Sequence, residues 1–219
     1  MNVAQGKADA GQTVKRPATY DLKALLIRVA WLSILLGLGM QALLVLIRIG
    51  NIPELQPLAA ELVQKVSWAF VVCMGLAVGM GVSQASPPVM GLAGLIAAPV
   101  GFYVARSLHK GTAELLGIST TSAAGPDPFL IALLRGVEYL CLAAAIGWLG
   151  RRAWAGAKAY ITAGLVAGLL FGGMFLALTS QSAPSAAALF AWGVNELVFP
   201  VGCSLILFVS EKLGKSVLS

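Results

Sequence analysis

Apolar positions along this chain gather into six long runs, separated by short polar segments. The runs cover residues 24–47, 67–83, 87–106, 129–149, 158–179 and 184–210. A helix needs about 20 apolar residues to cross the hydrocarbon of a bilayer. The pattern therefore predicts an all-α polytopic membrane protein with six transmembrane helices. Residues 23–219 would form one transmembrane domain, with a flexible, polar N-terminal tail at residues 1–22.

The polar segments between the runs predict short connections. The sequence SQASPP at residues 83–88 fits a tight hairpin, and Pro87-Pro88 is suited to the first turn of a helix. Residues 53–66 have apolar positions at helical spacing, which fits either a plain connector or a short helix on the membrane surface. Residues 107–127 fit a plain connector and end in TTSAAGPD, which has the composition of a loop, with Asp127 as a cap for the fourth span.

Composition and charge support membrane insertion and give an orientation. The chain is 58% hydrophobic and 11% charged, whereas a soluble domain has about 25% charged residues. Ten Lys and Arg residues fall on the side of the N-terminus and four on the other side. Lys and Arg concentrate on the cytoplasmic side, so both termini are expected in the cytoplasm, in a bacterial inner membrane. The net charge of +6 then favours anionic lipid headgroups as partners and gives no reason to expect nucleic-acid binding.

Two halves of the chain resemble each other. ALLIRVAWL (24–32) matches ALLRGVEYL (132–140), SQASPP (83–88) matches SQSAPS (180–185), and PVG occurs at 99–101 and at 200–202. The offsets are 108, 97 and 101 residues. With three spans in each half, a duplication would place residues 23–115 and 126–219 in opposite orientations. Such 3+3 inverted repeats recur in transporters, although a duplicated scaffold with no pathway fits equally.

Charged and amide side chains occur near the middle of two runs. Glu138 lies about 14 Å into the fourth run and Glu196 about 18 Å into the sixth, at 1.5 Å per residue. Arg135 precedes Glu138 by one helical turn and can pair with it. Glu196 has Asn195 beside it but no basic residue nearby, so it either reaches Arg135 or Arg28 on another helix or is carried protonated. A structural clasp and a functional carboxylate are both open for Glu196.

Proline and glycine mark matching positions in the third and sixth runs. Pro200 removes the amide that would bond to the carbonyl of Glu196, and Pro99 does the same for Leu95. Gly101 and Gly202 follow these prolines, so each helix would have a weak point near the middle of the membrane. Interrupted helices at this depth often line ion or substrate sites.

The functional hypothesis is a small transporter or channel for an ion or a small polar solute, linked to protons through Glu138 and Glu196. The alternative is a non-catalytic scaffold or accessory subunit that binds other membrane subunits or a second copy. No catalytic, metal or nucleotide motif is present, so neither an enzyme nor a cofactor is expected. The cysteines lie in separate runs and fit packing better than ligation.

Overall fold

The computed structural model describes residues 22–47, 55–83, 86–118, 126–180 and 185–216. Within these ranges the regular structure is entirely helical. The helices are α1 (Leu22–Ile47), α2 (Leu55–Ser83), α3 (Pro87–Leu115), α4 (Pro128–Leu149), α5 (Ala157–Thr179) and α6 (Ala186–Ser216). All six are long and apolar enough to cross a membrane, which agrees with the predicted class. The predicted N-terminal tail falls on residues 1–21 and lies outside the described ranges.

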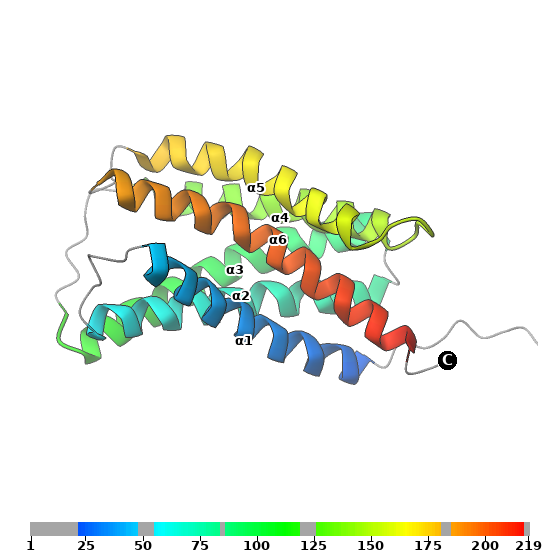
Figure 1. Cartoon of the computed structure of the whole chain (residues 1–219), viewed down its shortest axis with the longest axis horizontal. Coiled ribbons are helices and arrows are strands. Elements are labelled where there is room, and N and C mark those ends of the chain that lie inside the picture. Colours follow the sequence, from blue (N-terminus) through cyan, green and yellow to red (C-terminus); the bar gives the residue numbers. More distant parts are fainter. Residues whose placement is uncertain (1–21, 48–54, 84–85, 119–125, 181–184, 217–219) are drawn as a thin grey trace, which may run out of the picture.

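The helices alternate in direction along one bundle axis (Figure 1). Each helix packs against the next one in the chain, and α1 packs against α6, so the series of neighbours closes on itself. The sixth helix also contacts α2 and α4. α1, α3 and α5 therefore begin at the end of the bundle where α6 finishes, and α2, α4 and α6 begin at the opposite end. We call these the basic end and the open end, for reasons given below.

The second helix is longer than predicted and corrects the interpretation of residues 53–66. Residues 55–66 are the first half of α2 and form neither a separate surface helix nor a connector. Pro57 lies in the first turn, where its missing amide costs no hydrogen bond. Polar side chains that precede the apolar run at 67–83, among them Glu61 and Lys65, line a cavity inside the bundle.

The third helix also continues past its predicted end. Residues 107–115, predicted as loop, belong to α3, which includes a surface ion pair between Lys110 and Glu114 at 3.8 Å. The helix stops at Gly117, whose φ of 72° suits glycine. The amide of Ile118 donates to the carbonyl of Ala113 at 2.9 Å, and that of Gly117 to Glu114 at 3.1 Å, which is the Schellman pattern.

Two predicted helix starts are confirmed. α3 begins with Pro87-Pro88. The side chain of Asp127 accepts a hydrogen bond of 2.9 Å from the amide of Phe129 and caps α4.

Glycine stripes allow close contacts between neighbouring helices. Gly75 and Gly79 of α2 face Ala97 and Ala93 of α3. On α5, Gly164, Gly168 and Gly172 face α6. Both stripes therefore pack against neighbouring helices of the same chain.

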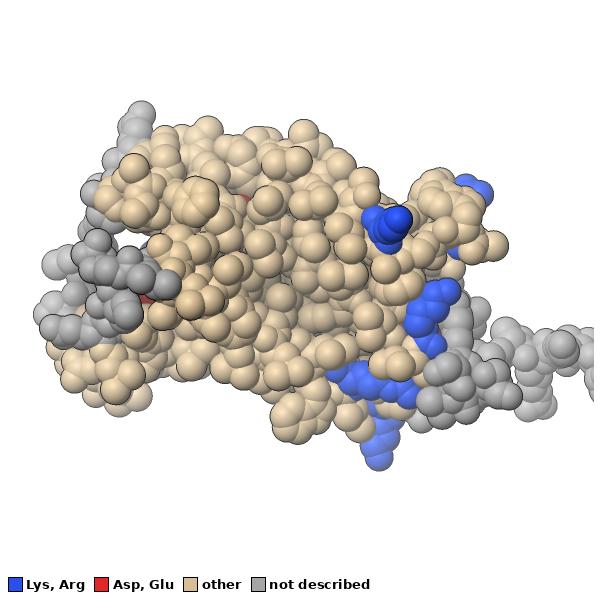
Figure 2. Space-filling model, viewed as in Figure 1, with Lys and Arg blue, Asp and Glu red and all other residues tan. Residues whose placement is uncertain are grey.

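The outer surface is apolar, and most of the Lys and Arg side chains lie at one end. Large apolar side chains point outward from the bundle, such as Leu35 (59% exposed), Leu92 (54%) and Leu169 (65%). Figure 2 shows Lys and Arg side chains gathered at the end where α1 begins and α6 finishes. Lys23, Arg151, Arg152, Lys158 and Lys212 lie in the segments that meet there. This end is the basic end of the bundle.

Candidate functional site

Three charged side chains form a connected group in the middle of the bundle. The guanidinium of Arg135 donates from Nη1 to Glu138 Oε2 at 2.8 Å and from Nη2 to Glu196 Oε1 at 2.5 Å. Nη1 also forms an ion pair with Glu196 Oε2, so Glu196 is held by both guanidinium nitrogens. Hydrogen bonds between a guanidinium and a carboxylate are among the stronger polar contacts in proteins, because both groups are charged. We call Arg135, Glu138 and Glu196 the charged triad.

Helix geometry places the two carboxylates at the same depth. Glu138 is ten residues after the start of α4, and Glu196 is ten residues after the start of α6. Both helices start at the open end, so each carboxylate lies about 15 Å from it at 1.5 Å per residue. α6 begins two residues later than its apolar run, which reduces the 18 Å expected for Glu196. The structure thus brings Glu196 to Arg135, and Arg28 lies near the basic end, early in α1.

Aromatic rings cover the guanidinium. Its carbon lies 4.7 Å from the ring centroid of Phe175 on α5 and 5.6 Å from that of Trp68 on α2. Trp68 in turn packs edge-on against Tyr139, with centroids 5.8 Å apart. Arg135 therefore contacts side chains of α2, α4, α5 and α6. Such a cation–ring contact contributes from about 0.5–1 kcal/mol at exposed sites to about 2 kcal/mol when desolvated.

Buried acceptor oxygens surround the triad. Glu138 is fully buried and Glu196 is 4% exposed. Asn195 donates from Nδ2 to Glu196 Oε1 at 3.3 Å. Among the described residues, Glu138 Oε1 and Asn195 Oδ1 are buried without a hydrogen-bond donor. Buried polar atoms are normally hydrogen-bonded, so both oxygens are able to accept from a ligand.

A polar cavity of about 370 Å³ connects Glu196 with the open end. Its wall includes the side chains of Leu44, Glu61, Gln64, Lys65, His109, Phe175, Thr179, Ala191, Trp192, Asn195 and Glu196. We call it the vestibule. A smaller cavity of about 80 Å³ lies beside it and reaches Arg135. At the edge of the vestibule, Gln41 of α1 donates from Nε2 to Glu61 Oε2 at 3.3 Å.

The vestibule contains residues that were not chosen from the sequence. Glu61, Lys65 and His109 lay in segments interpreted as connectors. A signal was present, because Gln64, Lys65 and Trp68 lie three, four and seven residues after Glu61 and so share one face of a helix with it. That face continues directly into the apolar run.

Between the triad and the basic end, the bundle is filled by packed apolar side chains. Leu76, Leu142 and Leu207 are fully or almost fully buried there. The Sγ atoms of Cys73 and Cys203 lie 3.3 Å apart in the same core, although the sequence gave no reason to pair them. The cysteines are free thiols and fill core space between α2 and α6.

Neither proline interrupts its helix. Both α3 and α6 run continuously through Pro99 and Pro200, so the expected weak points do not appear as breaks. Glycines of neighbouring helices cover the carbonyls that the prolines leave without an amide. A methyl group added at Gly136 would lie 3.2 Å from the carbonyl oxygen of Leu95, and one added at Gly168 would lie 3.0 Å from that of Glu196.

The other two predicted positions serve packing. Gly101 of α3 fits against Trp68 and Val72 of α2, and Gly202 of α6 fits against Leu36 of α1. Of the eight positions selected from the sequence, Arg135, Glu138, Asn195 and Glu196 come together in one site. The prolines and glycines shape the helices around it.

No protein-family model, curated protein or solved structure matches the chain. The part of the chain that the structure describes contains no group of three or more His, Cys, Asp and Glu side chains that could hold a metal ion. The groups that the site does present are its charges and its acceptor oxygens. It can bind a proton, a cation or a solute that donates hydrogen bonds.

Proposed function

We propose that the protein is an integral membrane transporter or channel for a cation or a small polar solute, linked to protons through the charged triad. The observation that carries the proposal is the polar vestibule that leads from the open end to Glu196 at mid-depth. We further propose a bacterial inner membrane as its location, with the basic end and both termini in the cytoplasm. That orientation follows from the concentration of Lys and Arg at one end.

Charge balance within the triad favours a proton or a cation as the ligand. Two carboxylates face one guanidinium, so the triad has one negative charge in excess when all three groups are ionised. A net charge at this depth costs at least about 2.5–3.5 kcal/mol. A proton or a cation arriving through the vestibule would remove that excess. The acceptor oxygens of Glu138 and Asn195 would provide its hydrogen bonds or ligands.

The arrangement of the triad would also allow Glu196 to bind and release its ligand. Arg135 contacts both carboxylates, so it can stay paired with Glu138 while Glu196 is protonated or binds a cation. The packed side chains between the triad and the basic end close the far side. A transporter would have to open that region in a second state, after Glu196 has been neutralised.

Reconstituted protein provides the test. Purified protein in liposomes is given an inward proton gradient, and internal pH is followed with an enclosed dye in the presence of Na⁺, K⁺ or methylammonium. We expect proton or cation flux above that of empty liposomes, and its loss in Glu196→Gln. The matched control is Glu114→Gln, because Glu114 is 60% exposed and pairs only at the surface with Lys110.

A specific result would reject transport. If the wild-type protein moves none of these ions above background, or if Glu196→Gln conducts like the wild type, the triad is not a transport site. Folding of each variant is checked by thermal unfolding in detergent, so that lost flux is not confused with lost protein.

One observation favours the alternative, a scaffold or accessory subunit of a membrane complex. Arg135 holds Glu196 with two nitrogens across α4 and α6, and little of either carboxylate is exposed. This is the geometry of a clasp between helices. Under this hypothesis the partner is another membrane subunit or a second copy, and removing the triad lowers stability without changing any flux.

A further inference from the structure

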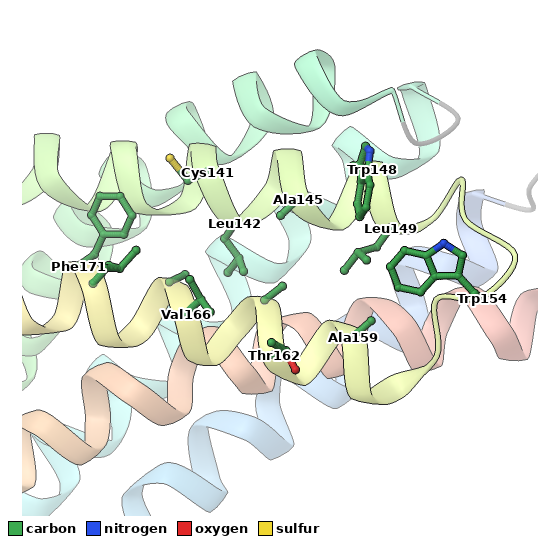
Figure 3. A pocket seen from close by; sticks show the side chains of 13 residues that line it. Cys141, Leu142, Ala145, Trp148, Leu149, Trp154, Ala159, Thr162, Val166 and Phe171 are labelled. Atoms are coloured by element: carbon green, nitrogen blue, oxygen red, sulfur yellow. The ribbon is translucent and has the colours of Figure 1, made fainter.

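An apolar groove lies on the outer surface between α4 and α5, away from the charged triad. Figure 3 shows it extending from Phe171 at one end to Trp148 and Trp154 at the other. Its volume is about 470 Å³, within the range of about 300–1,000 Å³ typical of ligand sites. The groove exists because α4 and α5 contact each other less extensively than any other pair of consecutive helices. Small side chains, Ala145, Ala159 and Ala163, leave its floor open.

The groove faces the surroundings of the bundle. Val166, Leu170 and Trp154 line it and are 50%, 62% and 66% exposed. In a protein that spans a membrane these side chains meet lipid tails. The groove's own wall is almost wholly apolar, so its occupant must be apolar over the same length.

The length of the groove matches one leaflet. Its lining on α5 extends from Ala159 to Phe171, and the twelve residue steps between them correspond to about 18 Å of helix. One leaflet contributes about half of a hydrocarbon core about 30 Å thick. The groove therefore starts near the basic end and reaches about the middle of the bilayer. Trp148 and Trp154 lie where aromatic side chains gather at membrane interfaces.

Positive charge adjoins the mouth of the groove. The guanidinium carbon of Arg152 lies 4.6 Å from the ring centroid of Trp148, which lines the groove. Arg151 belongs to the same connection, and Lys158 is in the first turn of α5. Basic residues between helices at the cytoplasmic side are suited to anionic lipid headgroups.

We propose that this groove is a binding site for one anionic phospholipid. An acyl chain occupies the apolar groove, and the phosphate lies at Arg152 with Arg151 and Lys158 nearby. A helix from a partner fits less well, because 18 Å of helix about 10 Å wide fills roughly 1,400 Å³, three times the groove. The proposal depends on membrane insertion and is independent of transport.

The experiment combines native mass spectrometry with thermal unfolding of the full-length protein in detergent. Phosphatidylglycerol, phosphatidylcholine and inorganic phosphate are added separately. We expect a one-lipid adduct with phosphatidylglycerol that survives detergent exchange, together with a rise in Tm. Phosphatidylcholine should give less of both, and inorganic phosphate should give neither.

Two kinds of variant test the two parts of the site. Ala163→Phe fills the groove, and Thr162→Phe does so from an exposed position if Ala163→Phe fails to fold. Arg152→Gln removes the charge. Each should lose the adduct and the rise in Tm. The controls are Ala177→Phe, an exposed alanine elsewhere on α5, and Lys110→Gln at the open end.

Several outcomes would overturn the proposal. Equal binding of both lipids would reject an anionic headgroup site, and an adduct that persists in the groove-filling variants would place the lipid elsewhere. A dimer that these variants dissociate would assign the groove to a second copy. A rise in Tm with inorganic phosphate alone would reduce the site to a surface anion site. Co-flotation of the protein with vesicles tests insertion separately.

Discussion

Replacing Arg135 with Gln should destabilise the fold more than replacing either carboxylate of the triad. Arg135 is the shared partner of Glu138 and Glu196, and those side chains are 1% and 4% exposed. Arg135→Gln leaves two carboxylates buried together without a cation. Glu196→Gln instead leaves Arg135 paired with Glu138, and the pair is neutral. Arg135→Gln should therefore lower the free energy of unfolding more than Glu196→Gln does.

Breaking a buried ion pair by removing one partner costs about 3–5 kcal/mol. Arg135→Gln should reach at least this range, and the loss of the contacts with Trp68 and Phe175 adds about 1–2 kcal/mol. In Glu196→Gln the amide oxygen can still accept a hydrogen bond from Arg135, so the cost should be about 1 kcal/mol. The expected gap is therefore at least about 2 kcal/mol.

The assay is reversible unfolding of the detergent-solubilised protein, by denaturant or by heat, with each variant measured under the same conditions. The triple change of Arg135, Glu138 and Glu196 to Gln should recover much of the stability lost in Arg135→Gln, because no buried charge remains. Lys110→Gln and Glu114→Gln are the controls. Their side chains are 68% and 60% exposed, and such surface pairs contribute about 0–1 kcal/mol.

If Arg135→Gln were as stable as Glu196→Gln, the carboxylates would not depend on the guanidinium. The triad would then be neutralised in another way or would lie in water. A triple variant no more stable than Arg135→Gln would likewise contradict the reasoning, because the loss would then come from packing.

Two further predictions address packing and topology. Gly164→Ala should cost about 1–3 kcal/mol, because the added methyl group would lie 2.6 Å from the Cα of Val201, whereas Gly173→Ala, with nothing within 4 Å, should change stability by less than about 0.5 kcal/mol. Thermal unfolding measures both, and equal effects would contradict the α5–α6 contact. Reporter fusions should alternate between outside and cytoplasm, starting outside, at positions 50, 85, 118, 154, 182 and 219. A cytoplasmic signal at 118 would contradict the proposed orientation.

Hydropathy predicted the number of helices but placed some of their ends wrongly. The ends of the apolar runs were set where polar residues appeared, as at Glu61 and Lys65. In α2 these residues face the vestibule, so the helix continues although its hydropathy falls. The same is true of α3, where His109 lines the vestibule beyond the predicted end. A run-length criterion assumes that polar residues lie outside the membrane, and a polar cavity inside the bundle violates that assumption.

The contacts of the site within one helix were predictable from the sequence, whereas most of its contacts between helices were not. The pairing of Arg135 with Glu138 follows from three-residue spacing within one helix. The bond from Arg135 to Glu196 was one of the alternatives that the sequence left open. Six alternating spans place the starts of α4 and α6 at the same end, but they do not show that these two helices approach each other. Trp68 and Phe175 belong to two further helices and could not have been assigned to Arg135. The two freed carbonyls were predictable from the prolines, but the glycines that cover them were not.

The predicted duplication bears on where function resides. In the structure, the stripe of Gly75 and Gly79 on α2 packs on α3, and the stripe of Gly164, Gly168 and Gly172 on α5 packs on α6, as two equivalent halves require. The proline contacts do not follow this pattern, because Gly136 of α4 covers the carbonyl in α3 whereas Gly168 of α5 covers the one in α6.

The charged triad is still less symmetrical. At the offsets of 108 and 101 residues, the counterparts of Arg135, Glu138 and Glu196 are Ile27, Ala30 and Leu95. All three are uncharged, so a duplicated ancestor would have kept or gained the triad in one half only. The inverted repeat stays a prediction, and it has one consequence for the mechanism. If the protein is the proposed transporter, a cycle in which the two halves exchange roles would need charges at the matching positions Ile27, Ala30 and Leu95, which are uncharged. Opening toward the basic end would then have to come from rearrangement around the charged triad, and the α4–α6 contact is where such a change would be measured.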